Sequence, residues 1–387
     1  MKIAIFDTYY ADVLRAVYER APGLENLPYA EQVRAVYDAG FGRADFLPFR
    51  LRQLGHEVEQ FIANGEALQR RWALEQGVRL PGARKQERSG PRNLLQRAIT
   101  SLKWRAGANS GPVAEKWETA AVAAQVKAYG PDVIFICNVL HLSPAFLREL
   151  KEGGRRLLVG EVAYPIPPDF DLRPYDLLLS AAPNYVARLR QAGARAEFLR
   201  LAFEPSVLQK LDANPKREGV MFIGHIGGYH QQRIKLLEEV SRRAPLSCWG
   251  AGTEILDPDS RLRNLFKKPL WGYEMYRKLQ QANIALNNHI DIADKYAANM
   301  RLYEATGVGT MLLTDWKENL GDLFEVGTEV VAYRSAEECA ELAEYYLDHQ
   351  AERETIAAAG QRRTLREHTY EHRMRELTTI LQQYLRR

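Results

Sequence analysis

The sequence predicts an α/β protein with two doubly wound parallel sheets. Two observations predict it: short apolar runs alternate with amphipathic helical stretches, and the series restarts after a polar, proline-containing segment at 204–218. Parallel strands need helical crossovers, so this alternation is typical of βαβ units. The length of 387 residues exceeds one compact core and suits two domains. We therefore expect two such domains facing a central cleft.

The first series occupies the N-terminal half of the chain. Its apolar runs predict strands at 2–7, 57–62, 133–138, 156–162, 175–180 and 196–201. Helices are expected between the strands, for example at 144–152 and 183–192, and in two insertions at 22–49 and 70–105. We expect residues 1–203 to form the first domain, with 204–218 as a linker.

The second series forms the C-terminal half. Its apolar runs predict strands at 219–224, 246–250, 284–288, 310–314 and 329–333. Helices are expected at 231–243 and 273–281, and the chain beyond Ser335 is almost entirely helical in pattern. We expect a second domain over 219–370 and a C-terminal helix, 371–387, that packs back toward the first domain.

Composition and charge exclude several classes of protein. The net charge of +4 is small for this length and does not indicate a nucleic-acid binder. Three widely separated cysteines form no CxxC or Cys/His cluster, so we expect reduced thiols, no zinc site and no disulfide framework. The short N-terminal apolar run, interrupted by Asp7, is a strand pattern rather than a signal peptide, and no run approaches 18 apolar residues. A cytoplasmic protein is the expectation.

Basic residues concentrate between positions 70 and 105, where ten of them face only two acidic residues. Leu94, Leu95, Ile99 and Leu102 share one face of a predicted basic amphipathic helix. Such a helix either packs on the domain with a solvated basic face, or contacts an anionic membrane surface or acceptor. The second alternative would place the protein peripherally at the inner face of the membrane.

Three strand ends of the second series carry glycine or polar residues. FIGHIGGYHQQR ends a strand at Gly224 and passes His225, Gly227 and Gly228 before a helix that carries Arg233. This is either a plain tight turn or a loop next to a phosphate, because glycines admit a ligand and a helix N-terminus attracts anions. CWGAGTE and LNNHIDI place Gly250 and His289 at the same sheet edge, where open α/β sheets bind ligands.

A fourth stretch, NMRLYEATGVGTMLLTD, predicts a short helix followed by a buried strand. Asn299 can cap this helix, and Arg301 and Glu304 fall on one face. The pair is either an intrahelical salt bridge or a ligand site. A cation near a helix N-terminus is repelled by the helix dipole, and a bound phosphate would offset this repulsion. A carboxylate can accept hydrogen bonds from two ribose hydroxyls.

On these residues, the sequence from about 219 to 373 resembles the nucleotide-sugar-binding domain of GT-B glycosyltransferases. The greatest similarity is to the group related to the spore-maturation protein CgeB, which often carries N-x-R-x-[FY]-E-x-x-x-x-G. The matching residues here are Asn299, Arg301, Tyr303, Glu304 and Gly309. The first half is similar only loosely, in PDVIFICN, YDLLLSAAPNYVARLRQAG and LAFEP, and would be the acceptor domain.

The resemblance implies that Arg301 holds the diphosphate of a UDP-, dTDP- or GDP-linked sugar and Glu304 its ribose. The full set of expected donor-binding residues is Gly224, His225, Gly227, Gly228, Arg233, Gly250, His289, Asn299, Arg301, Leu302 and Glu304. One departure concerns the E-x7-E pair of many retaining relatives, because Tyr296 precedes Glu304 by eight positions. That motif therefore assigns no stereochemical outcome.

Sugar transfer would need a general base at the strand ends of the first domain. The candidates are Asp7, His141 and Glu161, each of which has a structural alternative as a cap, loop or core residue. No metal or other cofactor is expected, since Asp257 and Asp259 in DPDS suit a turn. A nucleotide-sugar epimerase of the same fold and a non-catalytic nucleotide-sugar-binding or partner-binding protein remain open as alternatives. Product analysis with donor alone would separate them from a transferase.

Overall fold

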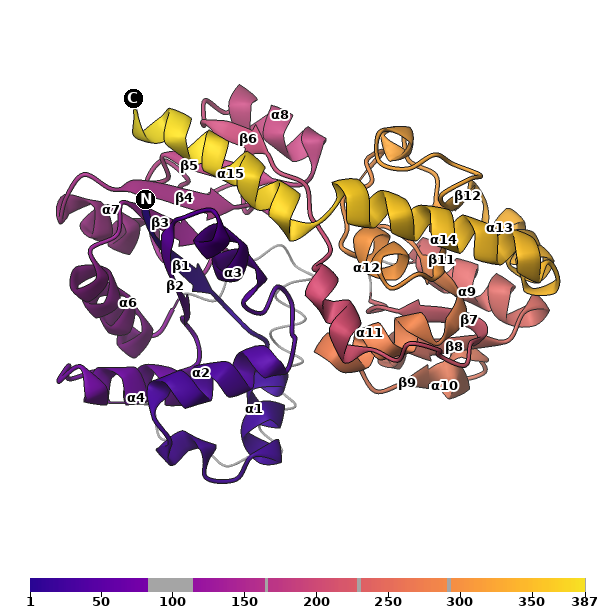
Figure 1. Cartoon of the computed structure of the whole chain (residues 1–387), viewed down its shortest axis with the longest axis horizontal. Helices are drawn as coiled ribbons and strands as arrows, with labels where there is room; N and C mark the ends of the chain where they lie inside the picture. Colours follow the sequence, from indigo (N-terminus) through magenta and orange to yellow (C-terminus); the bar gives the residue numbers. More distant parts are fainter. Residues whose placement is uncertain (83–113, 164–165, 228–230, 291–293, 387) are drawn as a thin grey trace.

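The chain folds into two lobes, each built around one parallel sheet (Figure 1). The computed structural model describes residues 1–82, 114–163, 166–227, 231–290 and 294–386. Gly228 and most of the basic stretch at 70–105 lie outside these residues. In the part of the chain that is described, no helix is both long and apolar enough to cross a bilayer.

The sheet of the first lobe has the strand order β2-β1-β3-β4-β5-β6, and every pair is parallel. Its strands are β1 (Lys2–Asp7), β2 (Glu57–Ile62), β3 (Val133–Ile136), β4 (Leu157–Glu161), β5 (Leu177–Ser180) and β6 (Ala196–Phe198). Ile3, Ala4 and Ile5 are all fully buried, although successive side chains point to opposite faces. Helices therefore cover both faces, as a doubly wound sheet requires.

The second sheet has the order β12-β11-β10-β7-β8-β9, again all parallel. Its strands are β7 (Glu218–Ile223), β8 (Leu246–Trp249), β9 (Phe266–Lys267), β10 (Ala282–Asn287), β11 (Met311–Asp315) and β12 (Val331–Tyr333). The order changes direction between β7 and β10, which is the topological switch point of this sheet. The two-residue β9 was not predicted, because so short an edge strand leaves no apolar pattern.

Helices occupy most of the remaining described chain. In the first lobe they are α1 (Ala11–Arg20), α2 (Tyr29–Asp38), α3 (Phe46–Gln53), α4 (Glu66–Glu75), α6 (Lys116–Tyr129), α7 (Pro144–Glu152) and α8 (Pro183–Gln191). From the second lobe onward they are α9 (Gln231–Arg243), α10 (Leu262–Leu265), α11 (Gly272–Gln280), α12 (Arg301–Gly307), α13 (Ala336–Asp348), α14 (Gln350–Glu367) and α15 (Tyr370–Leu385). The helix α15 returns to the first lobe and packs on α3 (Figure 1).

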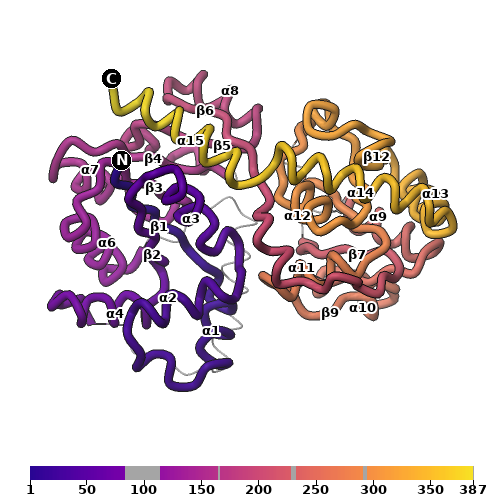
Figure 2. Tube along the Cα trace, viewed as in Figure 1, coloured from indigo at the N-terminus to yellow at the C-terminus, as the bar shows by residue number. Residues whose placement is uncertain are grey.

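The chain passes between the lobes twice, and the two crossings lie side by side (Figure 2). Phe203 pairs with Thr369 in a parallel bridge: its N–H donates to the His368 carbonyl at 2.9 Å, and its carbonyl accepts from the Tyr370 N–H at 3.0 Å. The Phe203 ring is fully buried against Gly307, where a Cβ would lie 2.4 Å from it. Glycine at this point lets α12 approach the crossing closely.

The segment expected to be a linker begins in a folded form. Residues Pro205–Lys210 make a 3₁₀ helix, η2, whose first N–H groups include that of Ser206, bonded to the Glu204 carboxylate at 3.1 Å. Glu204 is fully buried and also accepts two hydrogen bonds from the Arg50 guanidinium, at 2.9 and 2.5 Å. An ion pair therefore anchors the first crossing to α3.

Candidate active site

A cavity of about 360 Å³ lies between the two lobes, next to the switch point of the second sheet. The second lobe lines it with residues at the carboxyl ends of β7 and β10 and at the start of α12. The first lobe contributes loop residues after β1 and α2. The lining residues are Tyr10, Phe41, Gly42, Phe222, Ile223, Gly224, Arg233, Trp271, Gly272, Met275, Asn287, Asn288, Asn299, Met300, Arg301 and Glu304.

Arg301 and Glu304 form one wall of this cavity. The Arg301 Nη1 atom lies 2.8 Å from Glu304 Oε2, and the two side chains are only 14% and 7% exposed. Nη2 donates to the Ile223 carbonyl at 3.2 Å, which holds the guanidinium across the end of β7. Arg301 and Glu304 can therefore form a salt bridge and still contribute to a ligand site, because both residues line the cavity.

Burial raises the pKa of Glu304, and the positive charge of Arg301 offsets part of that rise. The carboxylate has up to four lone-pair sites, and Arg301 is its one ion-pair partner in the described chain. An ionised Glu304 thus keeps acceptor capacity for a ligand that donates hydrogen bonds. A diol is such a ligand.

Asparagines fix the loops that surround this pair. Asn299 Nδ2 donates to Asn287 Oδ1 at 2.8 Å, and Asn287 Nδ2 donates to Thr314 Oγ1 at 2.9 Å, which ties β10, β11 and the approach to α12 together. The expectation that Asn299 caps the helix was wrong. Met300 occupies the N-cap position and no side chain caps α12 there, because the Asn299 amide is engaged with β10.

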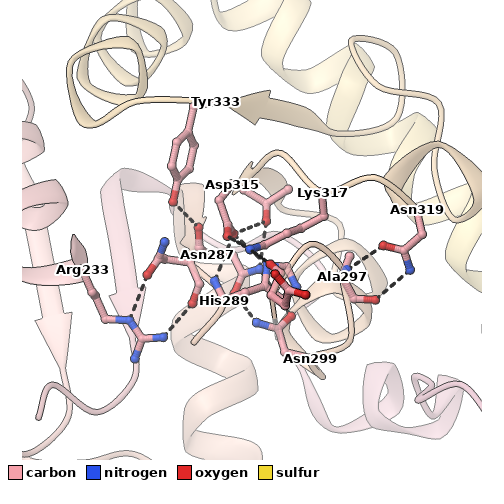
Figure 3. Close-up of polar contacts among 12 residues, drawn as sticks. Arg233, Asn287, His289, Ala297, Asn299, Asp315, Lys317, Asn319 and Tyr333 are labelled. Carbon is pink, nitrogen blue, oxygen red and sulfur yellow. Dashed lines mark hydrogen bonds and ion pairs between the residues drawn. The ribbon is translucent and has the colours of Figure 1, made fainter. Parts of the chain in front are cut away.

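Arg233 lines the cavity, and its guanidinium donates hydrogen bonds to the loops that follow β7 and β10. Its Nη1 donates to the His225 carbonyl at 2.6 Å. Its Nη2 donates to the Asn288 carbonyl at 2.7 Å, a contact drawn from Arg233 in Figure 3. The guanidinium also lies over the Phe222 ring, 5.5 Å from its centroid. Arg233 thus braces the ends of β7 and β10 against each other.

The expected glycines differ in what they do. Gly224 lines the cavity, and a Cβ there would lie 2.8 Å from the Phe222 ring. Gly250 does not line it, and a Cβ there would lie 1.9 Å from the Gly224 carbonyl oxygen, so this glycine permits the loops after β7 and β8 to touch. Gly227 and the exposed His225 are also outside the lining.

His289 and Leu302 are buried beside the cavity rather than in its wall. His289 Nδ1 lies 2.7 Å from Asp315 Oδ1, which also accepts the His289 backbone N–H at 3.0 Å (Figure 3). Burial disfavours the charged Asp315, but the His289 hydrogen bond and the Lys317 charge bring its pKa below the usual range. This pair orders the loop after β10.

In the first lobe, none of the three base candidates lines the cavity, but two of them are connected to segments that do. Glu161, at the end of β4, accepts a 2.6 Å hydrogen bond from Arg43, the residue after the cavity-lining Gly42. Asp7, at the end of β1, accepts from the Thr8 N–H at 2.8 Å. Burial and the nearby Glu161 raise the pKa of Asp7, while Arg43 and the Thr8 N–H act against that rise. Glu161 is thus ion-paired with Arg43, and Asp7 has a raised pKa.

The third candidate, His141, lies elsewhere in the lobe. Its Nε2 atom is 2.9 Å from Glu118 Oε2 on α6, and the two side chains are 8% and 10% exposed. Like the other two candidates, His141 does not line the cavity. Its surroundings are those of a core histidine that joins the end of β3 to α6.

Sequence reasoning missed the aromatic part of the wall. Trp271, before α11, contacts Tyr10 and Phe41 of the first lobe at ring-centroid distances of 5.2 and 5.6 Å. Tyr10 and Trp271 are 60% and 39% exposed. The available signal was large aromatic residues in loop segments, but only the packing of the lobes brings these three together.

The described residues contain no group of three or more His, Cys, Asp or Glu side chains arranged to hold a metal ion. Asp257 lies in a turn closed by a 3.0 Å hydrogen bond from the Ser260 N–H to its carbonyl, and both Asp257 and Asp259 are exposed. The turn expected for DPDS is therefore confirmed.

Comparisons with known proteins agree with this architecture. Residues 232–379 match the family model described as glycosyl transferase-like. No curated protein matches the sequence significantly. The fold resembles Alr3699/HepE from Anabaena in complex with UDP and glucose (13% identity, TM-score 0.58, 99% of this chain and 100% of that chain).

Two further structures have similar folds. They are a glycosyltransferase from Rickettsia africae (11% identity, TM-score 0.54, 99% of each chain) and sucrose-phosphate synthase from Thermosynechococcus elongatus (12% identity, TM-score 0.54, 99% of this chain and 98% of that chain). At such identities the structural likeness concerns the fold. The family match thus covers residues 232–379, and over nearly its whole length the chain has the GT-B fold of these structures.

Proposed function

We propose that the protein transfers a sugar from a UDP-sugar to a hydroxyl group of an acceptor. The observation that carries the proposal is the Arg301–Glu304 pair in the wall of a cavity at the switch point. The Arg301 guanidinium can bind a diphosphate, and the adjacent Glu304 carboxylate can accept hydrogen bonds from the two hydroxyls of a ribose. The HepE structure with UDP and glucose supports UDP as the nucleotide.

The donor would lie along the second lobe. Arg301 would bind the diphosphate and Glu304 the two ribose hydroxyls, while Gly224 lets the phosphates approach the backbone at the end of β7. As the glycosidic bond to the diphosphate breaks, Arg301 would stabilise the charge that develops on the leaving group. This scheme draws on protein groups and needs no metal.

The acceptor would lie against the first lobe, within residues 1–203. Its hydroxyl oxygen would attack the anomeric carbon while its proton passes to a carboxylate. Of the three candidates, Asp7 suits this role best, because its raised pKa favours proton uptake and it makes no ion pair in the described chain. Arg43 would hold Glu161 in place through their ion pair. Its positive charge would also partly offset the effect of the Glu161 charge on Asp7.

Replacing Asp7 with asparagine is expected to lower kcat about 10²- to 10⁴-fold, the usual contribution of a general base, with the KM for the donor nearly unchanged. In the wild-type enzyme, kcat/KM should fall as the pH drops through the raised pKa of Asp7, because a protonated carboxyl cannot accept the proton. His141→Ala is the matched comparison and should retain turnover. Full activity in Asp7→Asn, or its loss only in His141→Ala, would move the role to another residue.

The proposed reaction is tested by incubating the full chain with UDP-sugars and a panel of hydroxylated acceptors, followed by mass spectrometry of the products. A glycosylated acceptor and released UDP are expected. Conversion of the donor sugar without an acceptor would indicate an epimerase. Donor binding with no product across the panel would indicate a binding protein.

A further inference from the structure

A second and larger cavity, of about 620 Å³, lies on the helical insertion of the first lobe. It is bounded by α2, the edge strand β2 and the start of α11. Tyr29, Tyr37 and Tyr273 contribute three aromatic rings to its wall. None of its lining residues belongs to the site described above.

The wall of this second cavity is held in place before any ligand arrives. The Tyr37 hydroxyl donates to the Gln60 carbonyl at 3.2 Å, and Gln60 Nε2 donates to the Ala44 carbonyl at 2.9 Å. Tyr273 lies against Gly40, where a Cβ would be 2.7 Å from its ring and where φ is +65°. Fixed rings reduce the entropy lost on binding.

Four charged groups in the wall make no ion pair with another described residue. These groups are Arg34, Asp38, Asp45 and Glu59. Asp45 is half-buried, and burial raises its pKa. With Arg52, the wall carries two guanidinium groups and three carboxylates, so it does not favour a strongly anionic ligand.

We infer that this second cavity binds a neutral oligosaccharide segment of the acceptor. Carboxylates accept and guanidinium groups donate hydrogen bonds to vicinal hydroxyls, and tyrosine rings pack on the C–H faces of a pyranose. The acceptor assignment rests on the proposed sugar transfer. It would make the cavity a specificity site at a distance from the reacting hydroxyl.

The same two chain segments, 38–42 and 271–275, contribute residues to both cavities. Asp38 and Tyr273 line the second cavity, whereas Phe41 and Trp271, three and two residues away, line the first. A glycan held in the second cavity would therefore touch the segments that close the active site. Its binding can be measured independently of the chemistry.

The test is a glycan array that displays neutral and acidic oligosaccharides, probed with the full chain. The site variant is Arg34→Ala combined with Asp45→Asn, and the matched control is Arg155→Ala combined with Asp259→Asn, two exposed residues outside both cavities. We expect the wild type to bind neutral glycans, the site variant to bind them at least tenfold more weakly, and the control to match the wild type. The Kd for a UDP-sugar should be the same in all three proteins.

Binding of acidic glycans alone, binding of no neutral glycan, or unchanged binding in the site variant would overturn the inference. If the double variant loses UDP-sugar binding as well, its fold is affected, and the exposed Arg34→Ala alone then makes the same comparison. The array requires no turnover. Failure of sugar transfer in the product assay would therefore refute the proposed reaction without altering the result for the glycan site.

Discussion

Replacing Glu304 with glutamine is expected to weaken UDP-sugar binding about 10- to 100-fold. The accompanying decrease in the free energy of unfolding should be smaller than the loss of binding free energy. A hydrogen bond to a charged group contributes about 1.5–3 kcal/mol, and glutamine keeps the shape but offers one neutral acceptor oxygen in place of the carboxylate. Arg301 loses its counter-charge, but it keeps its hydrogen bond to the Ile223 carbonyl, and the glutamine amide oxygen can still accept a hydrogen bond from it. Isothermal titration calorimetry and urea denaturation measure the two quantities.

The matched control is Glu118→Gln. Glu118 is buried to a similar degree, 10% against 7% exposed for the Glu304 side chain, and it also lies beside a basic partner, His141. It does not line the cavity, so its replacement should leave the Kd unchanged. If Glu304→Gln lowered stability while the Kd stayed at the wild-type value, the Arg301–Glu304 pair would be a structural salt bridge.

The same substitution should also change how binding depends on pH. Because burial raises the pKa of Glu304, its carboxyl begins to take up a proton at a higher pH than an exposed glutamate would. Protonation removes acceptor capacity, so the affinity for a UDP-sugar should decrease as the pH falls through that raised pKa. A UDP-sugar is a diphosphate diester without a second phosphate ionisation, which keeps its own charge constant. Glu304→Gln should show a flatter profile.

The sheets could be predicted well because their strands are buried on both faces. Such strands read as continuous apolar runs, and the predictions for β1 and β2 agree with the observed bounds, Lys2–Asp7 and Glu57–Ile62. The predictions for most other strands differ by a few residues, since strand ends depend on hydrogen bonds to neighbours. Only β9, two residues at a sheet edge, gave no signal.

The second-lobe wall of the cavity was also predictable in part. Gly224 and the Arg301–Glu304 pair follow strands of one parallel sheet, and the carboxyl ends of such strands share an edge. The sequence could not show that Arg233 would brace two loops, because that depends on which carbonyls lie within its reach.

The first-lobe wall could not be predicted, because its residues meet only through tertiary packing. Arg43, which follows the lining residue Gly42, pairs with Glu161 at the end of β4, 118 positions away. Tyr10, Phe41 and Trp271 come from three loops and two lobes. Loop aromatic residues carry no periodic pattern, so their cluster depends on how the two lobes pack against each other.

Replacing Glu204 with alanine is expected to lower the free energy of unfolding by about 3–5 kcal/mol. The substitution removes one partner of a buried ion pair and leaves the Arg50 charge, 14% exposed, without its carboxylate. It also removes the acceptor for the Ser206 N–H at the start of η2. Urea denaturation, followed by both tryptophan fluorescence and circular dichroism, measures the change and checks whether the lobes unfold together.

The contrast is with Glu274→Ala, which removes a second Arg–Glu pair between the lobes. Arg20 and Glu274 lie 3.0 Å apart, but their side chains are 66% and 47% exposed. Solvent screens such a pair, and exposed ion pairs contribute about 0–1 kcal/mol. The two variants should therefore differ in stability by severalfold although the contacts are similar in length. Equal effects would mean that the crossing does not depend on burial of the Arg50–Glu204 pair, and that the packing of Phe203 alone holds the lobes in register.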